Sequence, residues 1–139
     1  MADYAAIRDG LKTRLETITA VKVAYDTVPD RVVVPSIVVS PGSPVATYSQ
    51  SFEGTAGALT LFRFELVALA GRFEPGAGQD VLDGFISGSG SVPTAIAGDR
   101  TLGGTVDYTE VSTALDYGNI AVADTAYYGC RFTVEAYAR

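Results

Sequence analysis

Three carboxylates are the residues of this chain whose type and spacing could do chemistry. Asp80 and Asp83 are spaced so that a helix would place both on one face, and Asp99 follows later in the sequence. Two or three oxygens in register can bind Mg²⁺ or act as a general acid and base. Acidic residues near a helix start are also explained by the helix dipole and by contact with water, and we favour that explanation for these three.

The residues that the chain lacks exclude several other kinds of catalytic site. It has no histidine and a single cysteine, Cys130. This removes the commonest general base and rules out a Ser–His–Asp or Cys–His arrangement, or a zinc site of nitrogen and sulfur ligands, within the chain. Cys130 falls on the apolar side of a predicted strand, so we interpret it as an inert core residue. We therefore predict no catalytic, cofactor-binding or metal-binding residues and no enzymatic activity.

The stretch Asp-Arg-Thr-Leu-Gly-Gly-Thr-Val at residues 99–106 could be taken for a phosphate-binding loop. Such loops need a Gly-x-x-x-x-Gly-Lys-[Ser/Thr] or Gly-x-Gly-x-x-Gly pattern between a strand and a helix. Here Gly103 and Gly104 precede a strand, and no lysine is near. Glycines in this order supply a positive φ for a tight reversal, so we predict a turn rather than a ligand site.

The composition is that of one folded domain with an acidic surface. The 139 residues are 47% apolar and 19% charged, and ten basic against sixteen acidic residues give a net charge of −6. That balance argues against a non-specific nucleic-acid binder, which needs lysine and arginine to neutralise phosphates. No apolar run approaches the roughly 20 residues of a membrane span, and the start of the chain does not have the pattern of a signal peptide. One cysteine cannot form an internal disulfide, so we expect assembly in the cytoplasm and no membrane partner.

Helical periodicity predicts three helices. Apolar residues at spacings of three and four predict a helix over residues 4–18, with Asp3 as its N-cap. A second amphipathic helix over residues 79–87 contains Gly84. Ser91 can cap a short helix that runs to residue 97, where Gly98 can end it.

Strand patterns account for most of the remaining chain. The predicted strands are short apolar runs at residues 21–25 and 36–40 and longer segments at residues 58–70, 106–117 and 126–137. The last two are joined through Gly118, Asn119 and the apolar run at residues 120–122. Residues 41–57 are small, polar and rich in proline near their start, and they exceed the usual loop length. We predict that they form an extended loop, an arm or a protruding hairpin.

The strands at residues 58–70 and 126–137 share one pattern. Each has an apolar face and an outer face with charges of both signs, Arg63 and Glu65 on the first and Arg131 and Glu135 on the second. Opposite charges that meet across a ladder favour pairing, so we expect these strands to be neighbours in one antiparallel sheet. The prediction is one α+β domain over residues 1–139: a mostly antiparallel twisted sheet with an N-terminal helix, a second helix and a short helix packed on one face.

Taken in order, the elements from residue 64 to residue 139 resemble the tail terminator proteins of long-tailed bacteriophages. The shared features are a strand ending near Arg72, the helix Gln-Asp-Val-Leu-Asp at residues 79–83, a Gly-Ser-Gly-Ser-Val-Pro spacer, a short helix with Ala95 and Ile96, the Asp-Arg-Thr-Leu-Gly-Gly stretch at residues 99–104, an alternating strand, a Tyr117-Gly118 turn and a final strand ending Ala138-Arg139. The predicted first helix and the Val-Pro-Ser-Ile-Val-Val strand at residues 34–39 fit the same plan.

This resemblance implies a hexameric ring on the head-proximal end of the tail tube, in the neck region of the virion. The ring would end tube polymerisation and give the head connector its docking surface. The implied partners are further copies of the chain, the tail tube protein and a head-completion or connector protein. DNA would pass through the channel without specific binding, and we expect part of the acidic charge to face that channel.

Closing such a ring requires one patch to meet a different patch on the next copy, so we look to edge strands and to the arm at residues 41–57. The expected interface residues are Tyr48, Phe52, Arg63, Glu65, Arg131 and Glu135. Two alternatives stay open. One is another neck or tail component, such as a head-completion protein or a tail-tube subunit, and the other is a small metal-binding enzyme that uses Asp80, Asp83 and Asp99.

Overall fold

The computed structural model describes residues 3–27, 29–48, 59–72, 78–122 and 124–138. Within them, three helices and five strands follow one another in the order α1 (Tyr4–Leu15), β1 (Val23–Tyr25), β2 (Ser36–Thr47), β3 (Thr60–Arg72), α2 (Gln79–Ile86), α3 (Val92–Ala97), β4 (Tyr108–Val122) and β5 (Thr125–Ala138). None of the helices is long and apolar enough to cross a membrane.

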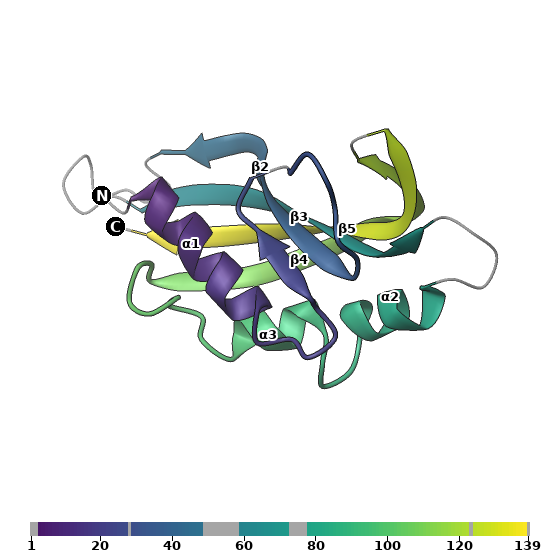
Figure 1. Ribbon diagram of the computed structural model, residues 1–139. Helices are drawn as coiled ribbons and strands as arrows, with labels where there is room; N and C mark the ends of the chain where they lie inside the picture. Colours follow the sequence, from purple (N-terminus) through teal and green to yellow (C-terminus); the bar gives the residue numbers. More distant parts are fainter. Residues whose placement is uncertain (1–2, 28, 49–58, 73–77, 123, 139) are drawn as a thin grey trace.

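The strands form one five-stranded sheet in the order β1-β2-β3-β5-β4. β1 pairs with β2 in parallel, and all other pairs are antiparallel. Figure 1 shows the three helices on one side of this sheet, with α1 crossing the strands and α2 and α3 below it. The predicted α+β class, with a mostly antiparallel sheet and helices packed on one face, is confirmed.

Two of the helices, α1 and α3, begin where the sequence predicts because a side chain caps each N-terminus, whereas α2 has no side-chain cap. The Asp3 carboxylate accepts a hydrogen bond from the Ala5 amide at 3.0 Å and so starts α1. The Ser91 hydroxyl accepts one from the Thr94 amide and starts α3, which ends at Gly98 as predicted. α1 ends at Leu15, three residues earlier than predicted, and the chain continues in turns to Ile18, which is still buried.

The main core lies between the helices and one face of β3 and β5. The helices contribute buried apolar side chains at helical spacing, among them Ile7, Leu11, Leu15, Leu82, Phe85, Val92 and Ile96. Alternate residues of the two central strands meet them, with Phe64 and Phe132 fully buried. The Tyr4 ring stacks on Phe64 with 4.7 Å between ring centroids, which fixes the start of α1 over β3.

A second apolar cluster lies on the opposite face of the sheet, which the sequence predicted to be charged. Its buried members are Val38, Val67, Leu69, Ile120 and Tyr127, and Tyr25, Val32, Val34 and Val122 pack against them. The face is therefore apolar at one end of the sheet and charged only along the rest. The segment between β1 and β2 supplies Val32 and Val34, and the far end of the β4–β5 hairpin supplies Ile120, Val122 and Tyr127.

The predicted turn at Tyr117 and Gly118 is wrong, because β4 continues through both residues to Val122. The register between β4 and β5 shifts between Leu115 and Gly118, and Asp116 takes a φ of 57°. This irregularity is a bulge, which bends a strand and increases its twist. Figure 1 shows the end of the hairpin turning out of the sheet, and this bend places Ile120 over the second cluster.

The predicted arm at residues 41–57 is also wrong for its first part, because β2 runs on to Thr47. Pro41 still pairs with Phe64, and pairing resumes at Ala46 opposite Phe62. Residues 42–45 are inserted between these two pairs as an irregularity. β1 pairs only with the first residues of β2, so beyond them β2 is an edge strand where proline, which has no N–H to donate, is tolerated. The rest of the predicted arm, residues 49–57, lies outside the described residues.

Two glycines differ in the space around their Cα atoms, which gives a matched test of the packing. An added Cβ at Gly129 would lie 2.7 Å from the Ala68 carbonyl oxygen, whereas one at Gly84 would meet nothing within 4 Å. We expect Gly129→Ala to lower the free energy of unfolding by about 1–3 kcal/mol through overpacking between β3 and β5. Gly84→Ala should raise it by about 0.5–1 kcal/mol, because alanine favours helix. Urea denaturation of both variants measures this, and equal effects would contradict the described packing.

Candidate interaction surface

The four charged residues predicted at the interface come together on the sheet face opposite the helices, which we call the open face. Arg63 lies directly across the β3–β5 ladder from Glu135, with 3.8 Å between the Arg63 Nε and the Glu135 Oε2. Arg131 contacts Glu65 at 3.0 Å and Asp116 of β4 at 3.1 Å. The predicted pairing of opposite charges across neighbouring strands is confirmed.

These ion pairs are too exposed to explain the stability of the fold. Their side chains are between 21% and 55% exposed, and pairs in such positions contribute roughly 0–1 kcal/mol each. Their main consequence is geometric, since they hold the charges of the open face in a fixed pattern of both signs. Such a pattern can select a partner and fix its register.

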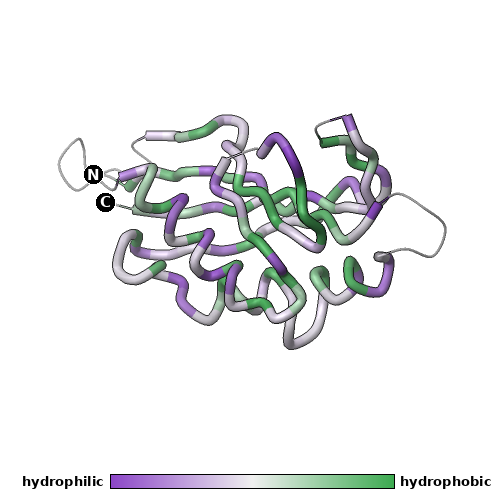
Figure 2. The backbone as a smooth tube through the Cα atoms, viewed as in Figure 1, coloured by the Kyte–Doolittle hydropathy of each residue, from purple (hydrophilic) through white to green (hydrophobic). Residues whose placement is uncertain are grey.

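Large apolar side chains are exposed along β4, the edge strand next to β5. Tyr108 is 41% exposed, Leu115 39% and Tyr117 44%. β4 pairs with β5 only and contains no proline or lysine, the residues that commonly protect an edge strand. In Figure 2 the β4 backbone alternates between polar and apolar segments along this edge. β4 is therefore the more accessible edge of the sheet, although its two register shifts interrupt it.

The opposite edge of the sheet is better protected. β1 is three residues long, and the outer part of β2 contains Pro41 and Pro44. Val45 is 43% exposed there, and Tyr48, which follows β2, is 64% exposed. The predicted interface residue Tyr48 is thus available to a partner, whereas Phe52 lies outside the described residues.

The exposed residues of β4 were not predicted as interface residues. Alternation shows that a segment is a strand, but it does not show which strand lies at an edge. The signal that could have found them is the low apolar content of the Tyr-Thr-Glu-Val-Ser-Thr-Ala-Leu-Asp-Tyr stretch at residues 108–117, which has too few apolar residues for a strand paired and covered on both sides.

The three candidate catalytic carboxylates are not brought together. The Asp83 carboxylate accepts a hydrogen bond from the Tyr117 hydroxyl at 2.8 Å, which ties α2 to β4 and raises the pKa of Tyr117. Asp99 lies in the turn after α3, and Asp80 lies in the first turn of α2. Across the described parts of the chain, no group of three or more cysteine, aspartate and glutamate residues could hold a metal ion.

The Asp99 carboxylate forms hydrogen bonds within the turn that contains it. One carboxylate oxygen accepts from the Gly103 amide at 2.9 Å, and the other accepts from the Thr101 hydroxyl at 2.9 Å. The Gly103 and Gly104 φ values are 72° and 90°, as predicted for a tight reversal. The Gly103 amide and the Thr101 hydroxyl favour the charged carboxylate and hold the pKa of Asp99 below its ordinary value.

Cys130 has the environment of a core residue. Its side chain is buried, and its thiol donates a hydrogen bond to the Leu115 carbonyl oxygen at 3.3 Å. Burial raises the pKa of the thiol, which leaves less of the reactive thiolate at neutral pH. The predicted burial of this residue is confirmed.

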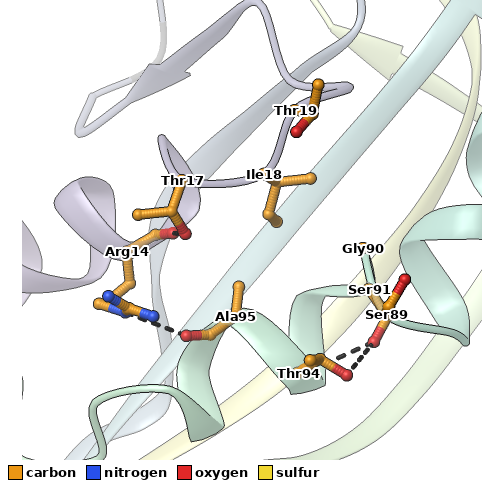
Figure 3. A pocket seen from close by; sticks show the side chains of 9 residues that line it. All are labelled: Arg14, Thr17, Ile18, Thr19, Ser89, Gly90, Ser91, Thr94 and Ala95. Carbon is orange, nitrogen blue, oxygen red and sulfur yellow. Dashed lines mark hydrogen bonds between the residues drawn. The ribbon is translucent and has the colours of Figure 1, made fainter.

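Two adjoining cavities lie where the end of α1 meets the loop between α2 and α3. Figure 3 shows the first, of about 340 Å³, which is lined by Arg14, Thr17 and Ser91 among others. Their polar groups are engaged within the chain: Arg14 Nε donates to the Ala95 carbonyl, the Thr17 hydroxyl donates to the Arg14 carbonyl, and the Ser91 hydroxyl donates to Thr94 Oγ1. The second, of about 450 Å³, adds Phe85 and Gly84 to its lining. Neither shows polar groups converging on a common point.

The hydrogen bonds of Asp99 should make the stability of the turn depend on pH. Because the folded pKa lies below the ordinary value, the charged form stabilises the fold above the unfolded pKa, and this contribution is lost as pH falls through the folded pKa. We expect Asp99→Asn to lower the melting temperature at neutral pH and to converge with the unmodified chain in acid, below the ordinary aspartate range. Circular dichroism at several pH values measures this. Asp9→Asn on the exposed side of α1 makes the same change in charge and is the control.

Comparison with protein families and curated proteins identified no relative of the chain. No protein-family model matches the chain, and no curated protein matches its sequence.

Proposed function

We propose that the chain is a structural virion protein that caps the head-proximal end of a phage tail tube as a hexameric ring, ends tube polymerisation and provides the docking surface for the head connector. The observation that carries the proposal is the position of the exposed apolar side chains. Tyr108, Leu115 and Tyr117 lie along one edge of the sheet, and Val45 and Tyr48 lie at the other. A chain that acts on a small molecule is expected to gather such groups in a cavity instead.

The two edges of the sheet differ from each other, and this difference favours a ring over a two-fold dimer in which one edge meets its own copy. In a ring, one patch of each copy meets a different patch of the next, and the rotation must close. The open β4 edge and the proline-containing β2 edge are different surfaces on opposite sides of one sheet. The order of elements that resembles tail terminator proteins supports the same assignment, and DNA would pass through the channel without specific binding.

A tail-tube subunit or a head-completion protein is the second candidate, and the same edges favour it. The two cases differ in closure: a terminator ring has a fixed number of copies, whereas a tube subunit polymerises without limit. Negative-stain microscopy of the purified chain, alone and with tail tubes, separates them. A closed ring of six at the end of the tube supports the proposal, tubes of unlimited length support the second candidate, and a monomer that never binds tubes argues against both.

A charge on the β4 edge should prevent assembly without unfolding the chain. Leu115→Glu places a carboxylate across from Arg131, where the fold tolerates it, but buries that charge in any contact that covers the edge. We expect the association constant between copies to fall at least about tenfold, measured by light scattering after size exclusion. Ala5→Glu, on the exposed side of α1, makes the same change in net charge and should assemble normally. Equal assembly of both variants would remove β4 from the interface.

A further inference from the structure

A polar cavity at one end of the sheet is lined by two arginines, Arg31 and Arg72. It has a volume of about 350 Å³ and is lined by Asp30, Arg31, Val32, Arg72, Thr125 and Tyr127. Arg31 and Arg72 are both exposed, and none of the ion pairs among the described residues includes either. Two guanidinium groups stand beside one carboxylate, so the lining keeps an excess of positive charge in a chain whose net charge is −6.

At the other end of the sheet, two carboxylates face each other across the β4–β5 ladder. Glu110 of β4 lies directly opposite Glu135 of β5, and like charges in this position destabilise a ladder. Arg63 contacts Glu135 and donates to the Thr47 hydroxyl. The ion pairs in the described part of the chain leave Glu110 without a cation.

One copy of the chain cannot bring these two groups together. Arg72 lies across the ladder from Tyr127, and Glu110 lies across from Glu135. Glu135 follows Tyr127 by eight positions along β5, which is about 27 Å of strand at roughly 3.4 Å per residue. The unpaired cations and the unpaired carboxylate therefore stand at opposite ends of the sheet, as the two halves of a head-to-tail contact would.

We infer that the cavity containing Arg31 and Arg72 receives the Glu110 carboxylate of a second copy of this chain. A guanidinium group matches the geometry of a carboxylate, and two arginines line this cavity together with Thr125 and Tyr127, whose side chains carry hydroxyls. Each copy carries −6, so neighbouring copies repel each other unless opposite charges meet where they touch. The inference rests on the proposed function, since it names the contact between copies that a ring requires.

Charge reversal with rescue tests the contact. Glu110→Arg alone and Arg72→Glu alone should each lower the association constant between copies about tenfold or more, because each brings like charges together. The chain with both changes should regain association to within about threefold of the unmodified chain. Sedimentation velocity measures association, and circular dichroism shows that each variant is folded. Asp9→Arg and Lys12→Glu on α1 make the same changes in net charge and should leave association unchanged.

A pair of cysteines gives a second measurement that captures weak association. In a Cys130→Ala background, Glu110→Cys together with Arg72→Cys should produce disulfide-linked ladders of copies on oxidation, either alone or on tail tubes. Each cysteine by itself should give at most linked pairs. The inference is overturned if the double-cysteine chain forms no ladder in either setting, or if the combined charge reversal fails to restore association while both single reversals weaken it.

The outcomes also separate this contact from the proposed function. Ladders and charge rescue in a chain that never binds tail tubes would keep the contact and remove the terminator role. Normal tail ends capped by the single-reversal variants would keep the role and overturn the contact. If Arg31→Glu and Arg72→Glu weaken retention of DNA in a filter-binding measurement and leave association unchanged, the arginines contact phosphate, and the inference is wrong.

Discussion

The pairing of β3 with β5 is the interaction on which the rest of the structure depends. The two strands are far apart in the sequence, yet they form the centre of the sheet and carry most of its buried aromatic residues, including Phe64 and Phe132. β2 adds to one side of this pair and β4 to the other, and the helices pack on the face that its alternate residues make apolar. Loss of this ladder would leave no surface for α1, α2 and α3 to cover.

The pairing of β3 with β5 also determines which side chains are exposed on the face of the sheet opposite the helices. Because the helices occupy one face, the outward residues of β3 and β5 place Arg63, Glu65, Arg131 and Glu135 together on the other. The bulge near Gly118 bends the β4–β5 hairpin and closes part of that face with a second apolar cluster. What stays exposed is a band of mixed charge bordered by two unlike edges. Such a surface suits contact with other proteins, where charge pattern selects the partner and apolar edges contribute affinity.

Net charge and local charge would have different consequences for the proposed assembly of this acidic chain with itself. A charge of −6 keeps separate copies apart in solution. Association then depends on places where the local sign is reversed. Arg63 and Arg131 are already paired within the chain, whereas Arg31 and Arg72 line one cavity together and so concentrate positive charge there. In a ring around DNA, the remaining negative charge would also limit binding of the phosphate backbone.

The sequence by itself determined the elements whose cause is local. Asp3 and Ser91 cap their helices through hydrogen bonds to amides two and three residues away, and the glycines after Asp99 form the turn that their φ values allow. Alternation along β3 and β5 also predicted their pairing and the meeting of their charges. The tertiary structure alone decided which strand is an edge, how far β2 continues past Pro41, and where β4 bends. These features depend on which strand lies alongside, and that contact joins residues too far apart in the chain for any local pattern to record it.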